Sequence, residues 1–177
     1  MPLERGLCDT DRTWFGDWEQ HLLRPREAAE TLLLETGLSK PHFDDVLRRD
    51  GREYGRVLAG LFERGLIDFS TPAGVRADVG VFFVKKGEEG EQLRIIIDTR
   101  MSNAHFVPPR STKLPSPAAF SQIDITADNG KSLKFVHADI ENAFYGMAIP
   151  EGLSQYFGLP GVQDKWLLDA GVPASAL

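Results

Sequence analysis

The sequence predicts an α+β fold, in which N-terminal helices are followed by a mostly antiparallel sheet. Apolar residues recur at helical spacing up to Gly65, and two runs rich in β-branched and aromatic residues, VGVFFVKK (79–86) and LRIIID (93–98), follow a change of character at Thr71-Pro72. We therefore expect a helical region over 1–70, a hairpin with a connector over 71–133, and the start of a further sheet region over 134–177.

Residues typical of helix starts and stops occur along the first region, 1–70. Pro25 suits a first helical turn and Gly37 a helix stop. A second helix is expected after Ser39, because acids precede bases in the order that the helix dipole favours: Asp44, Asp45, Arg48 and Arg49. The third helix has the clearest apolar stripe, followed by Gly65 at a capping position: Tyr54, Val57, Leu58, Leu61 and Phe62.

The two β-rich runs predict a hairpin closed by a Gly- and Glu-rich turn. Lys85 and Lys86 end the first strand and Arg94 begins the second, so these cations either converge on an anion or are solvated charges balanced by the turn acids Glu88, Glu89 and Glu91. Asp98 and Arg100 share a face and are expected to form a structural ion pair. After a Pro- and Ser-rich connector over 106–120, a third strand is expected at KFVHAD (134–139) and a fourth near 155–158.

Composition limits the function classes. The formal net charge of -6 argues against a protein that coats phosphates without sequence preference, although the segment from Arg76 to Lys113 is locally basic. The single cysteine, Cys8, excludes an internal disulfide and favours a reducing compartment. No window is apolar enough for a membrane span and no signal peptide is visible, so we expect an intracellular, cytoplasmic or nuclear protein without a membrane partner.

Asp139 stands where an apolar run ends, in KFVHADIENAFY. If the strand continues, His137, Asp139 and Glu141 alternate onto one face and form a plausible ligand set for a divalent cation. Alternatively, Asp139 caps the turn, His137 faces the sheet and Glu141 is solvated. Spacing alone favours this second interpretation. Aromatic residues near a turn, such as Phe144, are also more often core than ligand contacts.

The order of these features resembles the fingers and first palm motif of reverse transcriptases of the retroviral and retrotransposon kind, over about residues 58–158. The family pattern is a helix with a "GiI"-like end, an "FVkK" strand, a glycine-bearing turn, an "R-x-x-x-D-x-R-x-x-N" strand and a later strand-end "D-x-x-x-A-F/Y". The matching residues are Gly65-Leu66-Ile67, Phe83-Val84-Lys85-Lys86, Arg94, Asp98, Arg100, Asn103 and Asp139 to Phe144.

For the palm, the resemblance implies that Asp139 is the first catalytic aspartate and binds both divalent metals. Ile140 would give its backbone carbonyl to one metal, and Phe144 would be the aromatic gate that excludes a 2′-hydroxyl. The implied cofactor is Mg²⁺ or Mn²⁺, expected only for the complete enzyme, since hard cations take oxygen ligands and activate the primer 3′-hydroxyl in two-metal transfer.

For the fingers, the resemblance implies that Lys86 and Arg94 clamp the triphosphate of an incoming deoxynucleotide, with Lys85 the less favoured partner. Asp98, Arg100 and Asn103 would hold the fingers strands and contact the template side. Template-primer and dNTP are thus the implied partners, because Arg and Lys make charge-assisted hydrogen bonds to phosphate oxygens.

One part of the family pattern is missing. A second, aromatic-led pair of catalytic acids is required, but after Asp139 the sequence has only the single aspartates Asp164 and Asp169. We therefore expect a fragment of an RNA-directed DNA polymerase that is not competent alone and needs the missing palm and thumb segments.

Two alternatives remain open. The first is a winged-helix DNA-binding module, in which the third helix presents Arg56 and Arg64 to solvent and the hairpin turn is the wing; the turn acids argue against it. The second is a non-catalytic interaction domain that has kept a polymerase-like fold and lost the site.

Overall fold

The structure is a computed structural model that describes residues 3–87, 92–109, 116–122, 136, 138–139 and 146–177. The chain divides into two compact units, one made of Met1–Val107 with Met147–Leu177 and the other of Pro108–Gly146. The expected α+β class is confirmed at the level of mixed helices and one antiparallel strand pair. The domain boundaries expected after residues 70 and 133 stay a prediction.

The elements of the first unit follow one another in chain order. They are η1 (Leu3–Gly6), α1 (Asp9–Gly16), α2 (Trp18–Leu22), α3 (Arg26–Thr36), α4 (Asp45–Arg49), α5 (Gly51–Glu63), η2 (Pro72–Gly74), β1 (Gly80–Lys86), β2 (Gln92–Asp98), α6 (Arg100–Asn103), α8 (Glu151–Ser154), α9 (Asp164–Asp169) and η4 (Ala174–Ala176). The second unit contains α7 (Pro117–Ser121). None of the helices in the described parts of the chain has the length and apolar character needed to span a bilayer.

Three predicted helices are confirmed, two of them with the predicted glycine after the last helical turn. α3 ends at Gly37 and α5 is followed by Gly65, and both glycines have a φ of 65°, which residues with a Cβ rarely adopt. α4 begins later than expected after Ser39, because Asp44 is its N-cap and accepts from the N–H groups of Val46 and Leu47.

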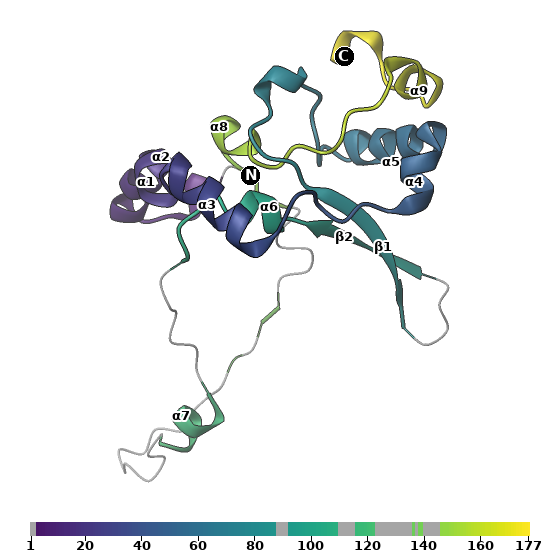
Figure 1. Ribbon diagram of the computed structural model, residues 1–177. Coiled ribbons are helices and arrows are strands. Elements are labelled where there is room, and N and C mark those ends of the chain that lie inside the picture. Colours follow the sequence, from purple (N-terminus) through teal and green to yellow (C-terminus); the bar gives the residue numbers. More distant parts are fainter. Residues whose placement is uncertain (1–2, 88–91, 110–115, 123–135, 137, 140–145) are drawn as a thin grey trace. The chain divides into compact units, whose positions relative to one another are not determined.

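The main core lies between the hairpin and helices α4, α5 and α9. In Figure 1, α9 lies over α5. Its buried residues are Phe43, Leu47, Tyr54, Leu58, Ala59, Val81, Leu167 and Val172. The Tyr54 hydroxyl donates to the Pro160 carbonyl at 2.8 Å, and burial raises the pKa of this phenol. The C-terminal segment therefore completes a core that the N-terminal helices begin.

The β1–β2 register gives the hairpin two different faces. Phe82 pairs with Ile96, Val84 with Arg94 and Lys86 with Gln92, while Val81, Phe83 and Lys85 pair with Ile97, Ile95 and Leu93. Directly opposed residues and residues two apart share a face. Val81, Phe83 and Ile95 pack in the main core, so we call their side the core face and the side of Phe82, Lys86 and Arg94 the cationic face.

The strand expected near 155–158 is wrong. Residues 155–157 follow α8 as a turn, and Gly158 makes only an isolated parallel bridge with Asp78. Backbone bonds from Val79 N–H to Gly158 and from Gly158 N–H to Ala77 hold this bridge at 2.8 and 3.0 Å. A single bridge supplies too few pairs for a ladder, because the chain enters from a helix and leaves toward α9.

A second buried cluster surrounds this bridge. Trp18, Ala77, Leu153 and Tyr156 form it, with the rings of Trp18 and Tyr156 packed edge to face at 6.3 Å between centroids. The segment for which the sequence predicted a strand is thus held by the packing of aromatic side chains and not by a ladder of backbone hydrogen bonds.

The second unit, Pro108–Gly146, includes most of the residues expected to form the connector and all of those expected to form the third strand. α7 begins where Ser116 caps it and Pro117 takes its first turn, so the end of the predicted connector is helical. Within 134–139, residues 134, 135 and 137 lie outside the described residues, and Val136, Ala138 and Asp139 are exposed and not in a strand.

Candidate functional site

Lys86 and Arg94 are diagonal neighbours on the cationic face. Lys86 pairs with Gln92, and Val84 pairs with Arg94. These two pairs are successive pairs on the same face of the hairpin, so Lys86 and Arg94 lie diagonally across the two strands. Both side chains are exposed. Diagonal neighbours on one face are separated by about 7–8 Å between Cα atoms, within reach of long side chains. One polyanionic ligand can therefore contact both.

Lys85 differs from its neighbour Lys86. Its partner is Leu93, and both lie on the core face at the exposed end of the hairpin. The register thus separates two adjacent lysines that the sequence left equivalent. The turn acids Glu88, Glu89 and Glu91 lie outside the described residues; of the described acids, none forms an ion pair with Lys86 or Arg94.

Asp98 and Arg100 form the ion pair predicted from sequence. Nε and Nη2 of Arg100 donate to the two carboxylate oxygens of Asp98 at 2.9 and 2.8 Å. The Asp98 side chain is 5% exposed and that of Arg100 61%. The bidentate fork fixes the guanidinium at the end of β2.

A backbone group from the N-terminal region also binds Asp98. The N–H of His42 donates to Oδ2 at 2.7 Å, and the N–H of Arg100 donates to Oδ1 at 3.2 Å. The Arg100 side chain first, and then these two N–H groups, hold the pKa of Asp98 well below its usual range, although burial opposes the shift. Asp98 therefore joins the chain at His42 to the end of β2 and the start of α6, through a carboxylate that stays ionised.

The segment Lys40–Asp44, which we call the strap, crosses the base of the cationic face. The His42 ring packs edge to face on Phe82 with 4.7 Å between centroids, and the Asp44 N–H donates to the Val81 carbonyl at 2.8 Å. A Cβ at Gly80 would overlap the His42 carbonyl oxygen. Glycine is thus required where the strap passes over β1.

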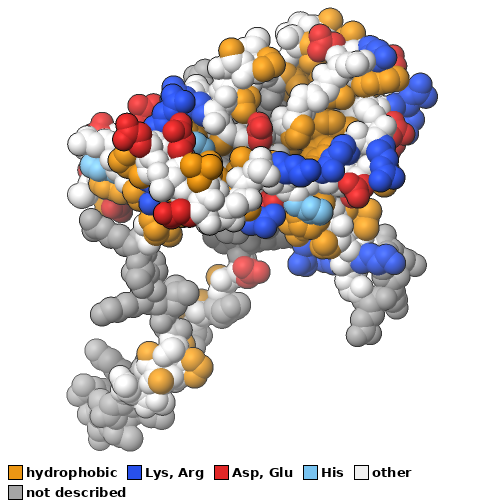
Figure 2. All heavy atoms as spheres, in the orientation of Figure 1, with side chains coloured by type: hydrophobic (Ala, Val, Ile, Leu, Met, Phe, Trp, Pro, Cys, Tyr) orange, Lys and Arg blue, Asp and Glu red, His pale blue; other side chains and the backbone are white. Residues whose placement is uncertain are grey.

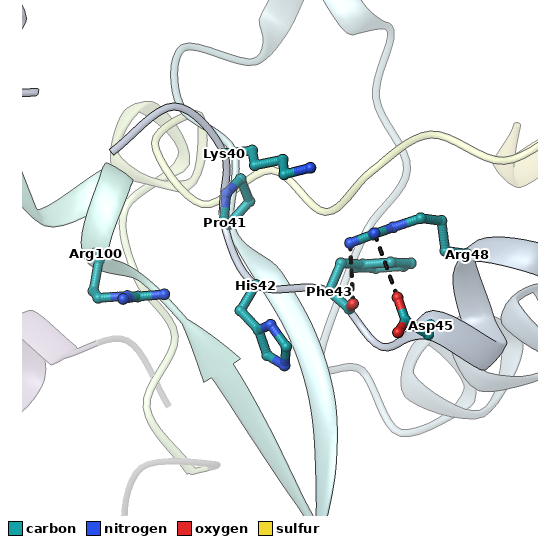
Figure 3. A pocket seen from close by; sticks show the side chains of 7 residues that line it. All are labelled: Lys40, Pro41, His42, Phe43, Asp45, Arg48 and Arg100. Carbon is teal, nitrogen blue, oxygen red and sulfur yellow. Dashed lines mark hydrogen bonds and ion pairs between the residues drawn. The ribbon is translucent and has the colours of Figure 1, made fainter. Parts of the chain in front are cut away.

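A pocket of 260 Å³ opens between the strap, α4 and α6. Figure 3 shows Arg48 and Arg100 reaching toward the strap from opposite sides. The pocket is lined by Lys40, Pro41, His42, Phe43, Asp45, Arg48 and Arg100. Sequence reasoning missed this pocket, because the pattern Lys40-Pro41-His42 is only loop-like in the sequence and nothing in it indicates proximity to Arg100.

Asn103, the third residue of the template-side prediction, is engaged locally. Its Nδ2 donates to Oγ1 of Thr99, the N-cap residue of α6, at 3.2 Å. The side chain remains exposed. This bond explains a structural role, and the template-side role stays a prediction.

The palm part of the predicted site lies in the other unit. Asp139 is exposed there, while Ile140, Phe144, His137 and Glu141 lie outside the described residues. The part of the chain that the structure describes contains no group of His, Cys, Asp and Glu arranged to hold a metal ion. The Mg²⁺ or Mn²⁺ site at Asp139 and Ile140, and the sugar gate at Phe144, stay predictions.

No protein-family model, curated protein or solved structure matches the chain.

Proposed function

We propose that the β1–β2 hairpin is a triphosphate-binding fingers element of a reverse-transcriptase-like polymerase. The observation that supports it best is the register, which puts Lys86 and Arg94 diagonally on one exposed face. A flexible ammonium and a planar guanidinium together suit a triphosphate, whose oxygens accept both point-charge and forked hydrogen bonds.

The other fingers residues support the same proposal by their rigidity. Arg100 is held in a fork by Asp98, and Asp98 is held by the strap. Fixed donors lose little conformational entropy when a ligand binds. In this proposal Asp98 supports the hairpin while Arg100 and Asn103 face the template.

Nucleotide addition needs more than this hairpin. Asp139 would bind the metals, but a two-metal site requires further carboxylates, and the single aspartates Asp164 and Asp169 are exposed at the two ends of α9. The proposal is therefore that the chain carries the fingers and the beginning of a palm, and that polymerisation depends on segments that supply the second acid motif.

Binding of dATP with Mg²⁺ to the whole chain tests the proposal. Lys86→Gln and Arg94→Gln should each weaken binding about tenfold, since a hydrogen bond to a charged group is worth roughly 1.5–3 kcal/mol. The readout is the chemical-shift perturbation of β1 and β2 amides during titration, with far-UV circular dichroism to verify the fold.

Lys85→Gln is the matched control. It removes the same charge from the adjacent residue on the opposite face, so it should change the dATP affinity less than twofold, as expected for an exposed charge that does not contact the ligand. Equal losses for Lys85→Gln and Lys86→Gln, or no saturable dATP binding to the unaltered chain, would contradict the proposal.

A winged-helix module is the second candidate, and one observation favours it. Arg56 and Arg64 are both exposed on or just after α5, although Arg56 pairs with Glu53 at 2.9 Å and Arg64 donates to the Gly60 carbonyl. Titration with a short DNA duplex separates the candidates. Shifts centred on Arg56 and Arg64 would favour a recognition helix, and shifts confined to the hairpin would favour fingers.

A further inference from the structure

The strap pocket has the composition of an anion site. Three cationic side chains, Lys40, Arg48 and Arg100, line it against one carboxylate, that of Asp45. Lys and Arg side chains also gather beside a histidine near α4 and the hairpin in Figure 2. Among its lining groups, positive charge therefore exceeds negative charge in a chain whose net charge is -6.

The Asp45 carboxylate does not cancel this excess. Arg48 Nη1 lies 3.4 Å from Asp45 Oδ1, and Arg48 Nη2 donates to the Phe43 carbonyl at 3.1 Å. The Asp45 side chain is 71% exposed, so water screens much of its charge. The carboxylate of Asp98 is not part of the lining, but it pairs with Arg100 at 2.8 Å. With Asp45 and Asp98 both counted, three cations face two carboxylates, and one positive charge remains in excess.

Two cations retain donors for a ligand. Arg100 uses Nε and Nη2 on Asp98, and within the described residues no hydrogen bond uses its Nη1. Lys40 is exposed, and within the same residues it forms no hydrogen bond or ion pair through its ammonium group. A prepositioned guanidinium and a mobile ammonium on the two sides of one cavity are the usual donors for phosphate.

The size of the pocket limits the ligand. Its 260 Å³ is below the roughly 300–1,000 Å³ of pockets for drug-sized molecules. The His42 ring packs on Phe82 and also lines the pocket, and a neutral or charged imidazole can donate to an oxyanion. A single phosphate group fits these limits better than a whole nucleotide.

We propose that the strap pocket binds one phosphate group through the Lys40 ammonium and Nη1 of Arg100, with Arg48 contributing its charge. The source is either inorganic phosphate or a phosphodiester of single-stranded nucleic acid, which present the same tetrahedral oxyanion. The site goes beyond the proposed triphosphate clamp, because it uses neither Lys86 nor Arg94; it shares Arg100 with the proposed template side and in that respect rests on the proposed function.

The test is a titration of the ¹⁵N-labelled whole chain with sodium phosphate against sodium chloride at matched ionic strength. Saturable shifts are expected for the amides of His42, Phe43, Asp45 and Arg100. Lys40→Gln, which breaks no hydrogen bond or ion pair within the described residues, should weaken phosphate binding about tenfold. Shifts that do not saturate, or an unchanged affinity in Lys40→Gln, would overturn the proposal.

Arg48→Gln and Arg26→Gln form the matched pair of variants. Each removes an exposed arginine that pairs with an acid on its own helix, Asp45 or Glu30, but only Arg48 lines the pocket. Arg48→Gln should weaken phosphate binding and Arg26→Gln should leave it unchanged. Equal effects would mean a general charge response and would also overturn the proposal.

A parallel titration with an oligothymidylate identifies the source of the phosphate. Competition with inorganic phosphate at the strap amides would identify a phosphodiester ligand, and binding of inorganic phosphate alone would identify the free anion; both results support the site. Oligonucleotide shifts confined to β1 and β2 with no inorganic-phosphate response would overturn it while leaving the triphosphate clamp intact.

Discussion

The two faces of the β1–β2 hairpin are built from the same strands but do different work. On the core face, Val81 is fully buried and Phe83 and Ile95 pack against the main core. On the cationic face, the strap covers only the base, and beyond it Val84, Lys86 and Arg94 are exposed. One face therefore contributes stability through apolar burial, while the other keeps its charges available to a ligand.

The difference shows that the role of a charged residue at a hairpin end depends on the register, because the register decides on which face of the hairpin the side chain lies. Lys85 and Lys86 are chemically identical and adjacent, yet the register puts only Lys86 on the side of Arg94. A slip by one residue would exchange the two lysines and move Val81 out of the core. Burial of Val81 thus fixes which lysine faces the ligand side.

The largest expected loss of stability comes from adding a side chain at Gly80, where the strap crosses the cationic face. Gly80→Ala should lower the free energy of unfolding by about 3 kcal/mol, because its Cβ would overlap the His42 carbonyl and overpacking forces the backbone apart. Urea denaturation measures it. Gly16→Ala is the control, since a Cβ there meets nothing within 4 Å; similar losses for both variants would refute strap packing at Gly80.

Removal of the charge beneath the strap should have the next largest effect. Asp98→Asn should cost about 2 kcal/mol at neutral pH, because it weakens hydrogen bonds from a guanidinium and from the His42 N–H. Glu30→Gln is the control, since its ion pair with Arg26 has the same 2.8 Å distance but is exposed. We expect that control to lose less than about 0.5 kcal/mol.

The same variant predicts a pH dependence. The pKa of Asp98 is lower in the folded chain than in the unfolded one, so its stabilisation is complete above the unfolded pKa of about 3.9 and is lost as the pH falls through the folded pKa. The stability gap between the unaltered chain and Asp98→Asn should narrow below about pH 4. A gap that widens in acid would mean that the pKa of Asp98 is raised, not lowered.

The smallest of the three stability effects compares the faces directly. Val81→Ala should cost about 1.5–2 kcal/mol from lost burial and a small cavity, while Val84→Ala should cost less than about 0.5 kcal/mol, because Val84 is 39% exposed. Thermal unfolding of both variants in one buffer measures the difference. Equal costs would show that the cationic face is packed as tightly as the core face.

Local signals in the sequence predicted α3, α4, α5 and the hairpin. Gly37, Gly65 and the acids and bases around α4 act within one or two turns, and the alternation of apolar residues in 79–98 depends on near neighbours. The Asp98–Arg100 pair was also visible, since two residues of separation put both side chains on one side of an extended chain.

The strap and the chain near Gly158 depend on partners distant in sequence. The His42 N–H binds a carboxylate 56 residues away, and the Tyr54 hydroxyl binds a carbonyl 106 residues away. No period or cap in a single sequence indicates such contacts. For the same reason the strap pocket was missed, while the strand expected near 155–158 proved to be one bridge within an aromatic cluster.

The division of the first unit into two pieces of chain has a consequence for synthesis. Residues 108–146 leave the ribosome before residues 147–177, which supply Leu167 and Val172 to the main core and the carbonyl that Tyr54 binds. Until then α5 and the core face of the hairpin have only part of their cover. Nascent chains that stop before α9 should accordingly be good chaperone substrates, because apolar surface that waits for a late segment is prone to aggregate.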